Sequence, residues 1–147
     1  MVLFYVEYTE MEHIVIIEDD TYFLKVITYL LEEAGYRVTG FTELTNVEEL
    51  SALKADCFII DEQLPNVNGH IICIMLKSRE QTKYIPVILA SAYEGLEGFA
   101  GMCKADAFLK KMSFNPEDLL DLVALTIART IENPTGLPDD DKLMANG

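Results

Sequence analysis

The chain has 147 residues, of which 50% are hydrophobic, and its 25 acidic and 11 basic side chains give a formal net charge of −14. This length suits one domain with a full core and is too short for two domains of ordinary size. The acidic balance argues against a nucleic-acid-binding surface, because such a surface neutralises phosphates with clustered Lys and Arg. It is more compatible with a bound cation or a basic partner.

The cysteines and the N-terminal residues indicate the compartment. Cys57, Cys73 and Cys103 are widely spaced and form no Cys-x-x-Cys or Cys/His ligand pattern. We expect them to be reduced core residues of a cytoplasmic protein. Residues 1–11 form an N-terminal extension that lacks the features of a secretory signal and is too short to span a membrane. The extension is either an extra edge strand or lies upstream of a natural start at Met11.

Apolar runs of strand length alternate with segments of helical periodicity along the rest of the chain. The predicted strands are residues 13–17, 36–41, 57–60, 85–90 and 107–109. The predicted helices are residues 22–34, 47–53, 70–79, 93–104 and 116–131. Residues 57–60 are uninterruptedly apolar, which is typical of a strand covered by helices on both faces. The alternation predicts an α/β fold with a doubly wound, five-stranded parallel sheet, five helices and right-handed crossovers.

Capping residues support the helix boundaries. Gly35 is a C-terminal cap of the first helix, Asn46 an N-cap of the second, and Asn115 an N-cap of the last. The fourth helix contains three glycines, each of which costs roughly 1 kcal/mol relative to Ala, so we expect it to be short or irregular. Residues 12–131 form the predicted domain, and the breaker-rich acidic tail, residues 132–147, is expected to be mobile.

Polar side chains follow four of the five predicted strands. Glu18 and Asp19 follow the first strand, Asp61 the third, Ser91 the fourth and Lys111 the fifth. The carboxyl ends of parallel strands share one edge, so these groups should meet in one crevice. Crowded carboxylates raise each other's pKa unless a cation lies among them. Mg²⁺ is commonly held by one or two carboxylates and waters, which leaves positions for phosphate oxygens.

This set of groups suits phosphoryl transfer. Asp61 is the candidate nucleophile, because Asp carboxylates form aspartyl-phosphate intermediates. Lys111 and Mg²⁺ would neutralise the phosphoryl oxygens, and the Ser91 hydroxyl would donate a hydrogen bond to one of them. An isolated Asp at a strand end more often only begins a loop. The agreement of four strand ends favours a site.

The motifs together resemble a known family. They are Ile14-Val15-Ile16-Ile17-Glu18-Asp19-Asp20, Phe58-Ile59-Ile60-Asp61 with Leu64-Pro65 and Gly69, Pro86-Val87-Ile88-Leu89-Ala90-Ser91-Ala92, and Ala105-Asp106-Ala107-Phe108-Leu109-Lys110-Lys111. Over residues 12–131 the chain is similar to the receiver domain of two-component response regulators, the CheY-like superfamily. The resemblance implies a flavodoxin-like or CheY-like sheet with strand order 2-1-3-4-5.

The resemblance also implies roles for the acidic residues and their neighbours. Asp61 matches the phosphoacceptor, and Glu18 and Asp19 match the acidic pair that binds Mg²⁺. Gln63 matches the residue that lends its backbone carbonyl to the metal, and Asp20 the third acidic residue of many members.

Further roles fall on the last two strands. Ser91 matches the switch hydroxyl, Phe108 the rotating aromatic switch and Lys111 the family lysine, with Lys110 one residue too early. Met112 stands where the family usually has a proline joined by a cis peptide. A cis bond to a non-proline residue costs about 2.5–4 kcal/mol, so we expect either retained strain or a trans bond with Lys111 aimed differently.

The function implied by the resemblance is phosphorelay signal transduction. Asp61 would accept a phosphoryl group from a histidine kinase or phosphotransfer protein, and the protein would catalyse only its own phosphoryl transfer and dephosphorylation. Residues 132–147 hold no output domain, so a single-domain regulator that signals by protein contact is expected unless the chain is a fragment. We expect a monomer or weak dimer that binds neither nucleic acid nor membrane.

Other functions remain open to different degrees. Met112 and the glycine-bearing fourth helix are compatible with a pseudo-receiver, an interaction module that does not cycle phosphate. An aspartate-nucleophile phosphatase would need a second catalytic Asp at the position of Gln63. A flavodoxin-like cofactor binder would need a phosphate-binding loop after the first strand, where an acidic run stands instead. His13 and His70 are expected to be structural or surface residues.

Overall fold

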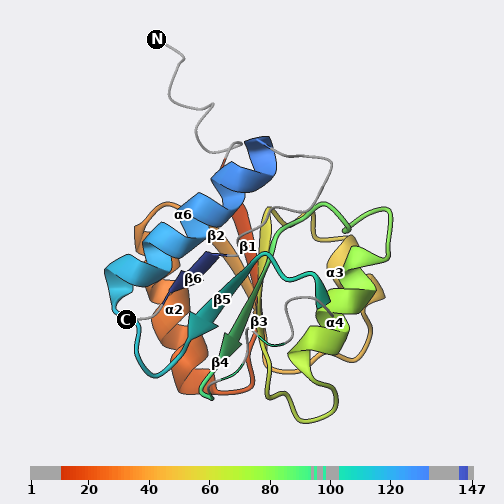
Figure 1. Cartoon of the computed structure of the whole chain (residues 1–147), viewed down its shortest axis with the longest axis horizontal. Coiled ribbons are helices and arrows are strands. Elements are labelled where there is room, and N and C mark those ends of the chain that lie inside the picture. The colour runs from red at the N-terminus through yellow and green to blue at the C-terminus, as the bar shows by residue number, and fades with distance from the viewer. Residues whose placement is uncertain (1–10, 94, 96–97, 99–102, 133–142, 146–147) are drawn as a thin grey trace.

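The computed structural model describes residues 11–93, 95, 98, 103–132 and 143–145. The strands are β1 (His13–Ile17), β2 (Arg37–Phe41), β3 (Cys57–Asp61), β4 (Val87–Ser91), β5 (Ala107–Lys110) and β6 (Leu143–Ala145). The helices of these residues are α2 (Thr21–Glu33), α3 (Glu48–Ser51), α4 (Gly69–Lys77) and α6 (Pro116–Glu132). All strand pairs are parallel, in the order β2-β1-β3-β4-β5-β6. In Figure 1, α2 and α6 cover one face of the sheet and α3 and α4 the other.

The predicted order of the first five strands is confirmed, and two predictions need comment. The described residues contain four helices rather than five, because most of the predicted fourth helix lies outside them, as do residues 1–10 of the N-terminal extension. Three residues of the tail that we expected to be mobile, Leu143–Ala145, pair with β5 as β6. The rest of the tail beyond Glu132 is outside the described residues.

The apolar strands are buried on both faces, as their sequences predict. Val15 and Ile17 of β1 belong to a cluster that includes residues of α3 and α4. Ile14 and Ile16 belong to a second cluster, with residues of α2 and α6. Period-two alternation therefore sends neighbouring residues of one strand into different cores. The sheet is held from both sides, and only its ends are open for polar groups.

Two of the three predicted caps lie where the sequence predicts them. The third prediction is wrong: the N-cap of α3 is Val47, which makes no side-chain cap bond, and Asn46 lies before it and accepts from the Glu48 backbone N–H at 2.9 Å. Asp20 is the N-cap of α2, and its side chain accepts hydrogen bonds from the backbone N–H groups of Tyr22 at 3.0 Å and Phe23 at 3.1 Å. Gly35 follows α2 with a φ of 100°, a conformation that favours glycine. Asn115 accepts from the backbone of Asp118 at 2.9 Å at the start of α6. The cap on α2 matters most here, because it fixes the turn beside the strand ends.

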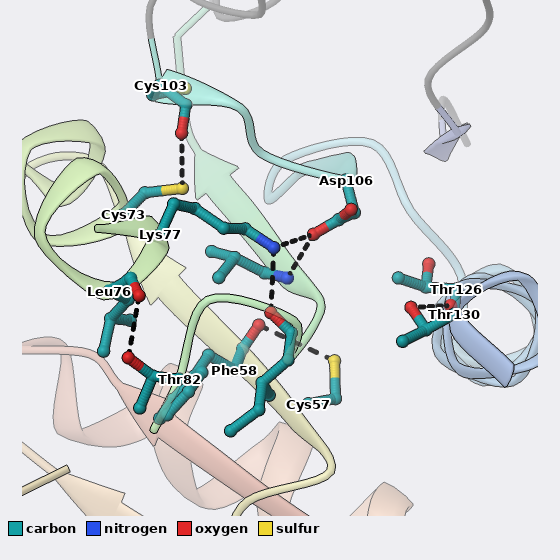
Figure 2. A network of polar contacts seen from close by, with 12 residues as sticks. Cys57, Phe58, Cys73, Leu76, Lys77, Thr82, Cys103, Asp106, Thr126 and Thr130 are labelled. Atoms are coloured by element: carbon teal, nitrogen blue, oxygen red, sulfur yellow. Dashed lines mark hydrogen bonds and ion pairs between the residues drawn. The ribbon is translucent and has the colours of Figure 1, made fainter. Parts of the chain in front are cut away.

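A closed polar group lies at the amino ends of β4 and β5 (Figure 2). Lys77 Nζ, at the end of α4, is 2.8 Å from Asp106 Oδ2 and donates to the Ile85 carbonyl at 2.9 Å. Asp106 Oδ2 also accepts from the Val87 backbone N–H at 2.8 Å. Lys77 and Asp106 carry one charge of each sign, so this group links α4 to the sheet without excess charge.

Candidate functional site

The parallel register brings the polar strand ends to one edge of the sheet. Ile17 pairs with Ile60, Asp61 with Ala90, and Ser91 with Lys110. Backbone hydrogen bonds extend the pairing past the strands: Glu62 N donates to Ala90 O at 2.8 Å, and Lys111 N to Ser91 O at 2.9 Å. The groups predicted to converge are therefore neighbours.

Three carboxylates meet at this edge. Glu18 is 2% exposed and Asp61 3% exposed, whereas Asp19 is exposed at the rim. Each of the three offers an oxygen, and these oxygens lie within 4.8 Å of one another. Asp20, the fourth acidic residue of the region, caps α2 with its side chain. An all-oxygen donor set of this kind fits a hard divalent cation.

Lys111 is the cation of the crevice. Its ammonium lies 2.7 Å from Glu18 Oε1 and 3.5 Å from Asp61 Oδ2, and its side chain is 11% exposed. The Lys111–Met112 peptide bond is trans, since no cis bond occurs among the described residues. The lysine thus reaches the acids without the cis peptide that the family usually carries at this point. Lys110, one residue earlier, is the last residue of β5.

The charge balance of the crevice shows in the pKa of Asp61. Burial, followed by the hydrogen bond and the negative charge of Glu18, raises this pKa from 3.8 to about 8. Lys111 and the backbone N–H of Gln63, 3.2 Å from Asp61 Oδ1, act in the opposite direction but more weakly. Burial and the neighbouring Glu18 carboxylate therefore favour the protonated form of Asp61, and an added cation would favour the ionised form.

Ser91 and Phe108 lie beside the crevice. The Ser91 hydroxyl, 2% exposed, donates to Gln63 Oε1 at 3.1 Å and accepts from the Tyr93 backbone N–H at 3.0 Å. It is thus engaged by the Gln63 side chain in this conformation. Phe108 is 1% exposed and belongs to the core cluster on the side of α4. For the predicted switch, Ser91 would have to leave Gln63.

The loop between β3 and α4 is closed by a buried pair that the sequence pattern does not predict. Glu62 accepts from the His70 backbone N–H at 2.8 Å, and its other oxygen lies 2.6 Å from His70 Nδ1. A Cβ on Gly69 would lie 2.3 Å from the Asp61 carbonyl oxygen, so only glycine fits there. His70 is therefore structural rather than a surface residue. An acid at a strand end and a histidine at the next helix start are the only sequence signals of the pair.

The fold is an α/β domain with an acidic crevice at the carboxyl edge of its parallel sheet, and comparison with known proteins gives its family. The family model "Response regulator receiver domain" matches residues 14–124. The DNA-binding dual master transcriptional regulator RpaA of Synechocystis is 32% identical over 129 residues, which cover 84% of this chain and 52% of the relative. The chain belongs to the response regulator receiver family, whose members act in two-component signal transduction. It spans about half the length of such curated relatives.

Solved structures agree with this fold. The beryllofluoride-activated receiver domain of DrrB is 31% identical, with a TM-score of 0.63 over 83% of this chain and 98% of that one. A CheY-like receiver domain from Methanospirillum hungatei has a TM-score of 0.76 over 84% of this chain and 99% of that one, at 23% identity. Among the described residues, no helix is both long and apolar enough to cross a membrane.

Proposed function

We propose that this protein is a phosphorelay receiver that accepts a phosphoryl group on Asp61 from a histidine kinase or a phosphotransfer protein. The observation that carries the proposal is the placement of Asp61. Asp61 is the last residue of β3 and is almost fully buried, and its carboxylate lies beside the Glu18 carboxylate and 3.5 Å from the Lys111 ammonium. A carboxylate held in this way can act as a nucleophile towards phosphorus, with a cation beside it for the transferred charge.

The resident metal of this proposal is Mg²⁺. Glu18, Asp19 and Asp61 would hold it, together with the backbone carbonyl of Gln63. The receiver domain of the sensor histidine kinase PA1611 from Pseudomonas aeruginosa, 24% identical, is described with a magnesium ion coordinated in its active site cleft. When bound, the ion would supply positive charge to the phosphoryl oxygens and favour the ionised form of Asp61.

The residues of the chain divide the work of the transfer. An Asp61 carboxylate oxygen forms the new bond to phosphorus while the bond to the donor's histidine nitrogen breaks, and that nitrogen keeps the electron pair. Lys111 neutralises charge on the phosphoryl oxygens, with Glu18 holding the ammonium in place. Ser91 leaves Gln63, and its hydroxyl donates a hydrogen bond to a phosphoryl oxygen. Phe108 is paired with Leu89, two residues before Ser91. Its ring turns with that change and shifts the balance between the inactive and active conformations of the surface that contacts the partner.

Output by protein contact completes the proposal. The net charge of −14 disfavours contact with nucleic acid, although relatives such as RpaA are DNA-binding regulators. We also propose that the protein is a cytoplasmic monomer or weak dimer and that it catalyses only its own phosphorylation and dephosphorylation.

The test uses beryllofluoride, which mimics an aspartyl phosphate. With Mg²⁺ present, beryllofluoride should shift the amide resonances of Asp61 and Ser91 and those along β5. Asp61→Asn should abolish these shifts, while the rest of its spectrum should remain that of a folded protein. A wild-type spectrum that does not respond would support the pseudo-receiver instead.

A further inference from the structure

The loop after β5 does not by itself direct Lys111. The backbone of Lys111 is fixed by its hydrogen bond to Ser91 O, but its side chain has four rotatable bonds beyond Cα. The next peptide bond is trans, and the side chain of Met112 is 81% exposed. The ion pair with Glu18 holds the ammonium from the side of the acids, and any further support must come from an element other than this loop.

Two aromatic rings lie where that support is needed. The Lys111 ammonium is over the ring of Phe23, 4.7 Å from the ring centroid. The ring of Phe23 meets that of Phe114 edge to face, with centroids 5.7 Å apart and an interplanar angle of 89°. A cation within about 6 Å of a ring centroid is attracted to the ring face, and more strongly where water is excluded. Edge-to-face packing in turn restrains the Phe23 ring.

The position of Phe23 is itself fixed. Its backbone N–H donates to Asp20, the N-cap of α2, so the first turn of the helix is tied to the acidic end of β1. Phe114 follows β5 on the chain segment that carries Lys111. The rings therefore connect the segments that carry the acids and the lysine.

We propose that Phe23 is a positioning residue that holds the Lys111 ammonium in the crevice, with Phe114 supporting its ring. This inference rests on the proposed function for its kinetic consequence only. The ammonium contacts the ring and both carboxylates, so the lysine is held without a proline in the following loop. Phe23 itself touches no reacting atom.

The first test needs no phosphorylation. The methylene protons next to Lys111 Nζ should resonate upfield of ordinary lysine values in the wild type, because they lie over the face of an aromatic ring. Phe23→Leu should abolish this displacement and Phe23→Tyr should retain it. Tyr22→Leu is the matched control, because it removes an aromatic residue of the same helical turn. Tyr22 is 77% exposed. An ordinary lysine shift in the wild type would overturn the proposal.

The second test measures phosphorylation by acetyl phosphate at saturating Mg²⁺. Phe23→Leu should lower the rate constant by about tenfold, the order expected for loss of a partly desolvated cation–π contact. Phe23→Tyr and Tyr22→Leu should remain within about twofold of the wild type. In a Lys111→Met background, Phe23→Leu should have no further effect, since the ring acts through the lysine.

The outcomes separate the two proposals. If Phe23→Leu is phosphorylated at the wild-type rate, or slows transfer equally when Lys111 is Met, the positioning role is wrong. If the folded wild type takes up no phosphate, the proposed function fails. The lysine resonances then still decide whether Phe23 holds Lys111.

Discussion

Two lysine–carboxylate groups lie at opposite ends of the same sheet and differ in their charge balance. At the amino ends of β4 and β5, Lys77 faces Asp106, and backbone groups satisfy both partners. At the carboxyl ends, Lys111 faces both Glu18 and Asp61, with Asp19 at the rim. The first group pairs one acid with one base, whereas the second places three carboxylates beside one ammonium and leaves one of them, Asp19, exposed.

The difference separates stability from binding. A paired, hydrogen-bonded ion pair needs no ligand and serves to join elements. At the other end, burial and the Glu18 carboxylate raise the pKa of Asp61 to about 8, and a cation placed among these carboxylates would favour their ionised forms. Removing charges at the two ends should therefore have different consequences.

The largest effect is expected at the closed end. Lys77→Met should lower the free energy of unfolding by about 2–3 kcal/mol, because it leaves the partly buried Asp106 carboxylate without its counter-charge. Urea unfolding measures the change. Added Mg²⁺ should not restore the loss, and restoration would contradict the separation of the two ends.

Lys111→Met should cost less and respond differently. It should lower stability by about 1–2 kcal/mol without metal, since Asp61 can take up a proton to relieve the remaining charge. Mg²⁺ should recover most of this loss by binding the freed carboxylates. The same unfolding experiment with and without Mg²⁺ checks this. A loss of stability that Mg²⁺ leaves unchanged would show that Lys111, like Lys77, only joins structural elements.

Asp61→Asn should stabilise the metal-free protein as the pH rises. The folded pKa of Asp61 is about 8 against an ordinary value of 3.8, so the unfolded chain loses this proton first. Stability is therefore lost as pH rises from about 4 to about 8, and Asn avoids that loss. We expect a gain of roughly 1–2 kcal/mol at pH 8 and almost none at pH 4. Equal stability of the two proteins at both pH values would show that Asp61 is not perturbed.

The smallest effect is expected at Lys104, just before β5. Its φ of 58° is unusual for a side chain other than glycine. Lys104→Gly should raise the free energy of unfolding by about 0.5–1 kcal/mol by relieving this strain. Mg²⁺ affinity should not change, because the residue lies at the closed end. Lys25→Gly, on the exposed side of α2, is the control and should destabilise.

Much of the crevice could be predicted because strand ends are readable from the sequence. Glu18, Asp61 and Ser91 directly follow or end apolar runs, and parallel pairing alone brings such ends together. The direction of the Lys111 side chain could not be predicted, because it depends on Phe23, which is 88 residues away in the chain. In the sequence, Phe23 is recognisable only as part of an apolar helix face. Side-chain contacts of this kind depend on tertiary packing rather than on period.

The sheet shows the same limit. The first five strands have apolar sequences long enough to be recognised, but β6 has three residues inside an acidic, proline-containing tail. Its pairing depends on the open edge that β5 offers, which no local pattern records. The Glu62–His70 pair likewise depends on the loop that Gly69 permits.

The central claim is that Asp61 accepts a phosphoryl group, and intact mass tests it most directly. Wild-type protein incubated with acetyl phosphate and Mg²⁺ should gain the mass of one phosphoryl group, and chelation of Mg²⁺ should prevent the gain. Asp61→Asn, shown to be folded, should gain none under the same conditions. A folded wild type that gains no mass, or an Asp61→Asn protein that gains as much, would contradict the account.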